Sequence, residues 1–168
     1  MQTELDDPAT PRRRAIELRQ TLSATALDHP FHSVITHFSF ATSDSFGRVI
    51  ICDTEIIRGI VLDFLVSTSL TQVWHNASYD FRHVYFNTRK FPLNYEDTQI
   101  LAKTLINHCD TSRSQTGLKY LAGHWYGAWG ISADNFELSH IYDDHVHHYA
   151  AIDACATFKL WTELQGRF

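Results

Sequence analysis

Residues 75–80, with the sequence HNASYD, are the most informative stretch of this chain for its architecture. They follow a short apolar run at residues 71–74 and open a helical pattern, which predicts a strand-to-helix junction. Ligands bind at such junctions in α/β sheets, because side chains beyond the strand ends project into a crevice. Asn76 and Asp80 are also typical helix-capping residues, and on their own they favour a cap over a binding site.

A second polar stretch, HYAAIDA at residues 148–154, lies inside a long helical pattern at residues 145–164. Tyr149 and Asp153 are four residues apart, so they share one face of the expected helix. An Asp beside a Tyr hydroxyl, with another Asp nearby, can hold a divalent cation through oxygen ligands while the phenol positions a water. Alone, this pair favours a polar stripe on an apolar helix.

Taken together and in this order, the two stretches resemble the second and third exonuclease motifs, Nx2-3(F/Y)D and Yx3D, of the DnaQ-like (DEDD, RNase H-like) 3'-5' exonuclease superfamily. Two intervening segments match as well: DTQILA at residues 97–102 and GLKYLA at residues 117–122. The similarity covers residues 27–164 and is greatest to the proofreading exonuclease domain of family A DNA polymerases and its stand-alone relatives. It implies an RNase H-like mixed five-stranded sheet flanked by helices.

The resemblance also implies a chemistry, the metal-dependent hydrolysis of phosphodiester bonds at the 3' end of single-stranded DNA. In that family, four carboxylates hold two Mg2+ or Mn2+ ions, which activate the attacking water and stabilise the leaving 3' oxygen. Carried over by position, Asp80 and Asp153 are metal ligands and Tyr149 orients or deprotonates the water. Asn76 and His75 support the substrate end. Asp97 has a structural role in this interpretation.

Two residues of this sequence are candidates for the base that activates the water. His148 lies five residues before Asp153 and satisfies the HxAxxDA pattern of the histidine branch, whereas Tyr149 satisfies the tyrosine branch. A histidine, with an ordinary pKa near 6.5, is a better base at neutral pH than a tyrosine near 10. The GLKYLA segment favours Tyr149, because one helix face can direct only one of these neighbours to the metals.

The first family motif, DxE on the central strand, has no clean copy. Alignment of residues 27–30 (LDHP) with the family's GLDP places Thr21 and Ser23 where the two acids belong. The alternating pattern from residue 15 offers Glu17 for the first acid but Arg19 for the second, and a fixed positive charge repels a cation.

Asp53 and Glu55 spell DxE literally but occupy the wrong place. They follow the predicted hairpin instead of preceding it, and Asp53 lies 27 residues before Asp80. A loop and a helix start, with acids near the positive end of the helix dipole, explain them more simply.

Three hypotheses follow from the missing motif. The enzyme is active with rearranged ligands, or it is a catalytically degenerate nucleic-acid-binding or assembly subunit, or it is one half of a split exonuclease. Two carboxylates leave too little negative charge around a pair of hard cations. If residues 14–23 do not form the central strand, a gap with unpaired backbone opens in the sheet, and a polymerase or another chain is expected to supply the strand.

Composition sets the outer limits. The chain has 168 residues, 44% hydrophobic and 20% charged, with a net charge of −5, which indicates a globular domain and excludes disorder. No apolar run is long enough to cross a membrane. Three cysteines without CxxC spacing, and no recognisable leader, predict a cytoplasmic, reducing location. An acidic protein has no global attraction for a polyanion, so metals or a local site must meet the phosphate.

The periodicity along the chain predicts an α/β domain at residues 14–168 behind a loose arm at residues 1–13. Residues 14–23 favour a strand, although a short helix also fits them. The other expected strands are residues 34–41, 48–52 and 71–74, and the expected helices are residues 56–67, 79–86, 98–106, 118–126 and 145–164.

Three further groups of residues have both a functional and a simple structural explanation. A patch of histidines and acids around residues 140–148 could hold zinc, but its spacing matches no standard site and a solvated helix start is favoured. Aromatic residues near residue 125 could stack on bases, and core packing is their commoner use. Three arginines near residue 13 could touch phosphates. These residues are His140, Asp143, Asp144, His145, His147, His148, Trp125, Tyr126, Trp129, Arg12, Arg13 and Arg14.

Overall fold

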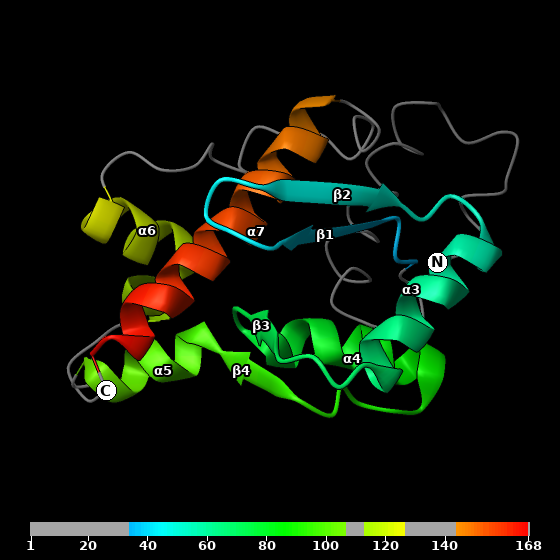
Figure 1. The fold of residues 1–168 in the computed structure, drawn as a ribbon, viewed down its shortest axis with the longest axis horizontal. Coiled ribbons are helices and arrows are strands. Elements are labelled where there is room, and N and C mark those ends of the chain that lie inside the picture. Colours follow the sequence, from blue (N-terminus) through cyan, green and yellow to red (C-terminus); the bar gives the residue numbers. More distant parts are fainter. Residues whose placement is uncertain (1–33, 107–112, 127–143, 168) are drawn as a thin grey trace, which may run out of the picture.

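The computed structural model describes residues 34–106, 113–126 and 144–167, and this part of the chain is a mixed α/β structure (Figure 1). Strands come first and helices dominate the second half, as the sequence predicts. The elements are β1 His37–Ala41, β2 Gly47–Ile51, α3 Glu55–Ser67, β3 Gln72–Trp74, α4 Ala77–Thr88, β4 Tyr95–Asp97, α5 Thr98–Leu105, the 3-10 turn η1 Arg113–Thr116, α6 Leu118–Tyr126 and α7 Asp144–Gln165.

Strands β1 and β2 form the predicted hairpin. They are antiparallel, with His37 opposite Ile51 and Ala41 opposite Gly47. Gly47 allows α7 to approach the hairpin, because a Cβ atom there would lie 2.6 Å from the carbonyl oxygen of Ala151 and 2.9 Å from the Sγ of Cys155. A glycine at the strand start therefore fixes the close packing of α7 on this pair.

Strands β3 and β4 form a second, parallel pair, with Gln72 opposite Tyr95 and Trp74 opposite Asp97. Helix α4 connects them, which makes a βαβ unit. The sequence does not predict β4, because its three residues, Tyr-Glu-Asp, are too few and too polar to give a strand pattern.

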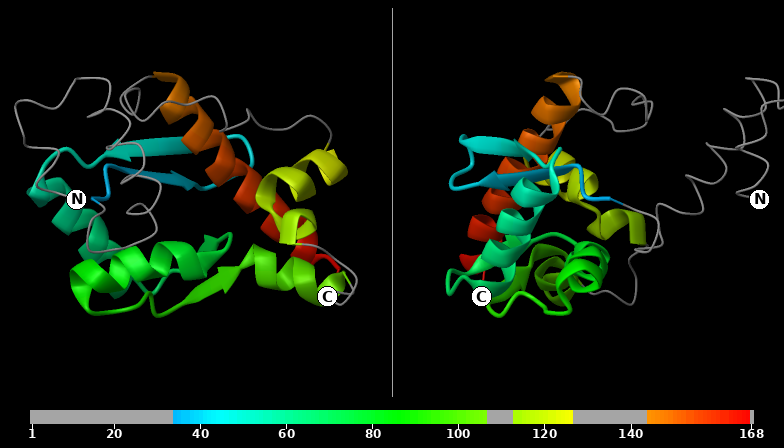
Figure 2. Two further views of the ribbon diagram at one scale, coloured as in Figure 1. Left: turned by 180° about the vertical axis from the view of Figure 1, so that it is seen from behind. Right: turned by 90° about the vertical axis from the view of Figure 1, so that its right-hand side faces the viewer.

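Helices cover both faces of the hairpin. Phe38 and Ile50 pack against a buried cluster that α3 dominates, with Trp74 and Val84 from the second strand pair and α4. Side chains alternate between faces along a strand, so the face that carries Gly47 lies opposite, against α7. Figure 2 shows α7 running across the hairpin, and α7 also contacts β3.

The C-terminal half of α7 builds a second cluster with α5 and α6. Ala102, Leu121, Leu160 and Leu164 are fully buried there. Leu160 and Leu164 are four residues apart and therefore share one face of α7, which packs against α5 and α6. Helix α7 therefore packs against both the hairpin and the helical end of the molecule.

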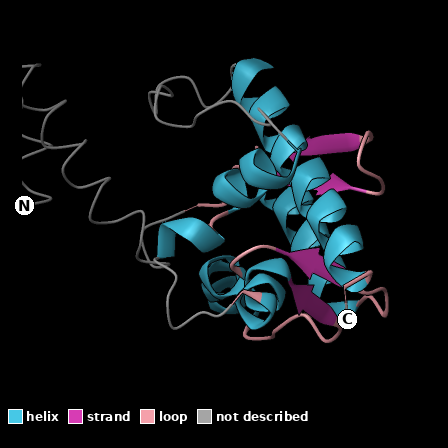
Figure 3. Cartoon of the chain, turned by 90° about the vertical axis from the view of Figure 1, so that its left-hand side faces the viewer, coloured by secondary structure: helices cyan, strands magenta, loops and turns pink. Residues whose placement is uncertain are grey.

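The described strands make two separate two-stranded pairs, β1-β2 and β3-β4, and not one five-stranded sheet (Figure 3). Within the part of the chain that the structure describes, no strand joins β1 to β3. The arm at residues 1–13 and the strand expected at residues 14–23 lie outside the described residues. No helix among the described residues is long and apolar enough to span a membrane.

Candidate active site

The β3-α4 junction is held by Asp97, not by the residues of the HNASYD stretch. The Asp97 carboxylate is 7% exposed and accepts hydrogen bonds from the backbone N–H groups of Asn76 at 3.0 Å, Ala77 at 2.8 Å and Gln99 at 2.8 Å. It therefore caps α5 and also holds the first turn of α4. These three hydrogen bonds are a structural role for Asp97, which is the kind of role that the sequence predicts.

Asn76 does not cap α4 with its side chain. It adopts the left-handed conformation at φ 60°, which Asn tolerates better than most residues, and its Oδ1 accepts a hydrogen bond from the Ser78 hydroxyl at 3.2 Å. Asn76 is exposed at the junction. Because Asp97 takes over the capping, the amide of Asn76 stays at the surface.

Asp80 lies in the first turn of α4 and lines a groove of about 360 Å³. Burial raises its pKa to about 6; a hydrogen bond from its own backbone N–H acts against this rise, and the negative charge of Asp97 adds to it. A nearby cation would stabilise the charged form of this carboxylate and lower its pKa again. The surroundings of Asp80 therefore favour the binding of a positive group.

His75 is partly buried at the junction. Its Nδ1 lies 2.8 Å from the hydroxyl of Thr98, and that hydroxyl donates to the carbonyl oxygen of Trp74 at 3.1 Å. Because the one hydroxyl proton is used on Trp74, Nδ1 carries a proton and donates to Thr98. Burial lowers the pKa of His75 to about 4, with Asp97 and the Thr116 backbone opposing the shift. The ring is neutral and its contact with Thr98 links the end of β3 to the start of α5. The resemblance predicts instead that His75 supports the substrate end.

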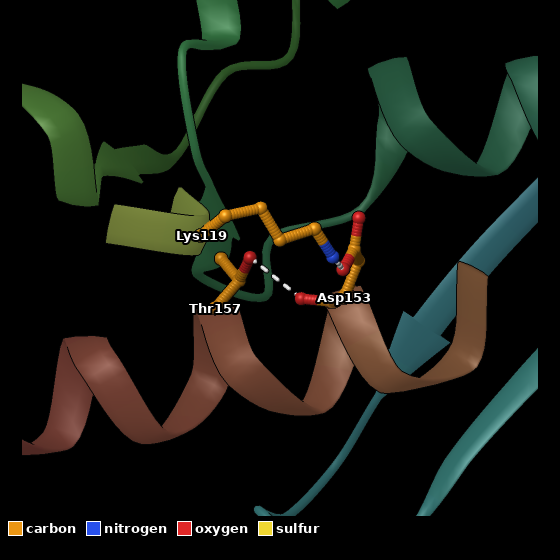
Figure 4. A network of polar contacts seen from close by, with 3 residues as sticks. All are labelled: Lys119, Asp153 and Thr157. Atoms are coloured by element: carbon orange, nitrogen blue, oxygen red, sulfur yellow. Dashed lines mark hydrogen bonds and ion pairs between the residues drawn. The ribbon is translucent and has the colours of Figure 1, made fainter. Parts of the chain in front are cut away.

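Tyr149 and Asp153 meet at one cation, the ammonium of Lys119. Figure 4 shows the Lys119 side chain reaching from α6 to Asp153 on α7, where Nζ and Oδ1 form an ion pair. The same Nζ lies 4.2 Å from the centre of the Tyr149 ring. The two α7 residues therefore share one side of the helix, which faces α6, while His148 is exposed.

Lys119 is a functional candidate that the sequence patterns do not single out. It is the third residue of the GLKYLA segment, which carries part of the family resemblance. The side chains of Lys119 and Asp153 are 39% and 25% exposed, so their ion pair is accessible to solvent. Only the packing of α6 on α7 brings the lysine to the carboxylate.

The described residues by themselves do not complete a metal centre. Over residues 34–106, 113–126 and 144–167, no group of three or more His, Cys, Asp or Glu side chains could hold a metal ion. Asp80 and Asp153 supply oxygen ligands of the right kind but are only two. Asp53 and Glu55 are exposed at the start of α3 and do not join them, and Glu17 lies outside the described residues.

In the structure, one histidine of the patch expected around residues 140–148, His147, contacts a histidine of β1. The Nε2 atoms of His147 and His37 lie 3.0 Å apart, so one ring must donate and the other accept. Burial, reinforced by His147, lowers the pKa of His37. Asp144 is exposed at the start of α7. His140, Asp143, Trp129, the side chains of Trp125 and Tyr126, and the arginines near residue 13 lie outside the described residues.

No protein-family model matches the chain, and no curated protein matches it. The resemblance to DnaQ-like exonucleases therefore rests on the residues of the chain alone.

Proposed function

We propose that this chain is a DnaQ-like 3'-5' exonuclease domain, with an RNase H-like five-stranded sheet, that acts on the 3' end of single-stranded DNA. The observation that carries the proposal is the convergence of Tyr149 and Asp153 on one cation at the surface of α7. A second carboxylate, Asp80, is partly buried in the first turn of α4 and has a raised pKa. Both carboxylates are thus in surroundings that favour a positive charge.

The roles of the residues follow from their surroundings. Asp80 and Asp153 would hold Mg2+ or Mn2+, with further acids from outside the described residues, Glu17 among them. When bound, the ions would activate a water and stabilise the leaving 3' oxygen. The Tyr149 hydroxyl would orient that water, and His148, exposed one residue away, is the alternative base. The exposed amide of Asn76 would contact the terminal nucleotide.

Lys119 would change its partner as the site fills. A lysine side chain is long and flexible, and an ion pair this exposed is worth little, so a divalent cation can displace the ammonium from Asp153. The released ammonium would remain near Tyr149, in reach of a phosphate that enters the site. Asp153 thus keeps a positive partner with and without substrate.

A second candidate function is non-catalytic binding of nucleic acid or assembly with a polymerase. The specific observation in its favour is the same ion pair, because an ammonium fixed on Asp153 neutralises a carboxylate that catalysis needs. In that case Lys119 acts as a permanent substitute for the metal. The two candidates make opposite predictions for cleavage.

The test is the degradation of a 5'-labelled single-stranded oligonucleotide with Mn2+ or with EDTA. The Asp80→Asn and Asp153→Asn variants keep the side-chain shape and remove the charge. Asp63→Asn, which changes an exposed carboxylate on α3, is the matched control. We expect a metal-dependent ladder that both site variants lose and the control retains.

Failure of the wild-type chain to cleave, together with binding of the same oligonucleotide measured by fluorescence anisotropy, supports the non-catalytic candidate. Cleavage that survives both site variants contradicts the proposed site.

A further inference from the structure

Two histidines from distant parts of the chain meet between β1 and α7. The Nε2 atom of His37, in β1, lies 3.0 Å from the Nε2 atom of His147, in the first turn of α7. The ring centres are 4.9 Å apart and the ring planes are inclined by 47°, so the rings meet through these nitrogens and are not stacked. The tertiary fold alone creates this pair, because the two residues are 110 positions apart.

The distance between the two nitrogens is suitable for a shared metal ion. Imidazole nitrogens bind zinc at about 2.0 to 2.1 Å, so two of them on one ion lie roughly 2.9 to 3.4 Å apart, for right-angled to tetrahedral ligand angles. The observed 3.0 Å falls inside this range. A hydrogen bond between the rings also accounts for this distance in the metal-free chain. A metal ion would take the place of its proton, which would move to the Nδ1 atom of the same ring.

The opposite nitrogen of each ring has an oxygen nearby. The Nδ1 atom of His37 lies 3.0 Å from the hydroxyl oxygen of Thr36. The Nδ1 atom of His147 lies 4.0 Å from a carboxylate oxygen of Asp144, whose exposed side chain can turn closer. A histidine that binds a metal through one ring nitrogen commonly donates the proton of the other to such an oxygen, which fixes the tautomer. Both rings therefore have the surroundings of metal-binding histidines.

The two rings are attached to elements that are packed closely together. Helix α7 contacts both strands of the hairpin, and a Cβ atom on Gly47 would lie 2.6 Å from the carbonyl oxygen of Ala151, one turn after His147. Ligands on such rigid elements hold their geometry better than ligands on loops. The side chain of His147 is 21% exposed, so an ion can reach the pair from solvent.

We propose that His37 and His147 bind one divalent transition-metal ion of the class that prefers imidazole nitrogen, such as Zn2+. This preference separates the site from the one proposed for Asp80 and Asp153, because Mg2+ and Mn2+ prefer oxygen ligands. The pair supplies two protein ligands, fewer than a structural zinc site has, so water completes the coordination and the ion exchanges with solvent. The proposal does not depend on the exonuclease activity, because it follows from the geometry of the two rings.

A bound ion would link the first turn of α7 to β1. Tyr149 follows His147 by two residues, so the link would restrain the part of the helix that carries the tyrosine. An ion that binds the folded chain more tightly than the unfolded chain also stabilises the fold. We therefore expect Zn2+ to raise the melting temperature of the chain.

Calorimetric titration of the full chain with Zn2+ tests the inference. Every chain in the comparison carries Asp80→Asn and Asp153→Asn, which remove the oxygen ligands of the other proposed site. We expect saturable Zn2+ binding that His37→Gln and His147→Gln each weaken about tenfold or more. His124→Gln, which changes an exposed histidine on α6, is the matched control and should leave the affinity unchanged. An excess of Mg2+ should not compete with Zn2+.

A second measurement keeps the inference testable if the histidine variants lose their fold. Paramagnetic Cu2+, which also prefers imidazole, broadens the NMR signals of nearby nuclei. In the chain with both histidines, we expect Cu2+ to broaden the backbone N–H signals of residues 36–38 and 146–148 before those of α5. Broadening that begins in α5 or in other parts of the chain contradicts the site.

Absence of Zn2+ binding to the chain with both histidines overturns the proposal. So does Zn2+ binding that both folded histidine variants retain with unchanged affinity, which assigns the ion to other ligands. A rise in melting temperature that depends on the chain concentration at constant free Zn2+ overturns it as well, because the ion then lies between two chains.

Discussion

Asp97 and Asp153 are both acids in the candidate site, but they are held in opposite ways. Asp97 is buried and accepts three backbone hydrogen bonds that tie together two helix N-termini. Asp153 has a partly exposed carboxylate whose partner is one flexible lysine. Backbone donors are fixed by the fold, whereas a lysine can leave. The comparison separates an acid that builds the site from an acid that is available to a ligand.

Asp97→Ala is expected to have the largest effect on stability. The substitution leaves three buried or partly buried N–H groups without their acceptor, and we expect a loss of about 3 kcal/mol in the free energy of unfolding. Urea denaturation measures it, with Asp63→Ala as the exposed control. A loss no larger than that of the control would remove the distinction between the two acids.

Tyr149→Phe sharpens the α7 side of the comparison. The substitution keeps the ring beside Lys119 and removes the hydroxyl, so we expect at least a hundredfold loss of cleavage rate with little change in stability. His148 is exposed and one residue away. Because Tyr149 is the proposed residue that orients the water, His148→Gln should change the cleavage rate less than threefold. The reverse order in the oligonucleotide assay would assign the base to His148.

Asp80→Asn tests the buried acid through pH. The pKa of Asp80 is about 6 in the folded chain against an ordinary value of 3.8, so the folded state binds more protons between these values. Stability therefore falls as pH rises from about 4 to 6, and the full cost remains above pH 6. We expect Asp80→Asn to stabilise the metal-free chain by roughly 1 to 2 kcal/mol at pH 7.

His75 makes the opposite contribution to the pH dependence of stability, and this difference allows the contributions of Asp80 and His75 to be separated. Its pKa of about 4 lies below the ordinary value of 6.5, so the unfolded state binds more protons in this window and stability falls as pH decreases. The two trends oppose each other in the wild-type chain. Urea denaturation from pH 4 to 7 should show a steeper loss toward acid in Asp80→Asn; an unchanged slope contradicts this account of Asp80.

Lys119→Met should have the smallest effect on stability. The ion pair with Asp153 is partly exposed, so we expect less than about 1 kcal/mol change in the free energy of unfolding. We expect a severalfold lower Mn2+ concentration for half-maximal thermal stabilisation, because Asp153 no longer has a competing partner. Lys159→Met, also on α7, is a charge-matched control. Unchanged Mn2+ dependence would show that Lys119 does not compete for the site.

Local patterns in the sequence predicted the fold wherever the pattern was long. The hairpin, α3 and α7 have clear periods of two or 3.6 residues, and the structure confirms them. β4 was missed, because strand pairing and not its own residues makes Tyr95–Asp97 extended. Only the resemblance predicts the five-stranded sheet, and the described residues contain four strands in two separate pairs.

The candidate site was predictable in its residue types but not in its contacts. The spacing of Tyr149 and Asp153 places both on one side of α7, which a helical period fixes. The partnership with Lys119 depends on tertiary packing of α6 on α7, and the partly buried position of His75 depends on its contact with Thr98. No local pattern reports such contacts, because they join residues 23 to 34 positions apart.

The central claim is that Asp80 and Asp153 belong to one metal site. A Mn2+ titration by calorimetry on the full chain, comparing wild type, Asp80→Asn, Asp153→Asn and the double variant, tests it most directly. The account predicts binding to the wild-type chain that each single variant weakens almost as much as the double variant, since the ligands act together. Equal binding in all four chains, or effects of the two substitutions that simply add, would contradict a shared site.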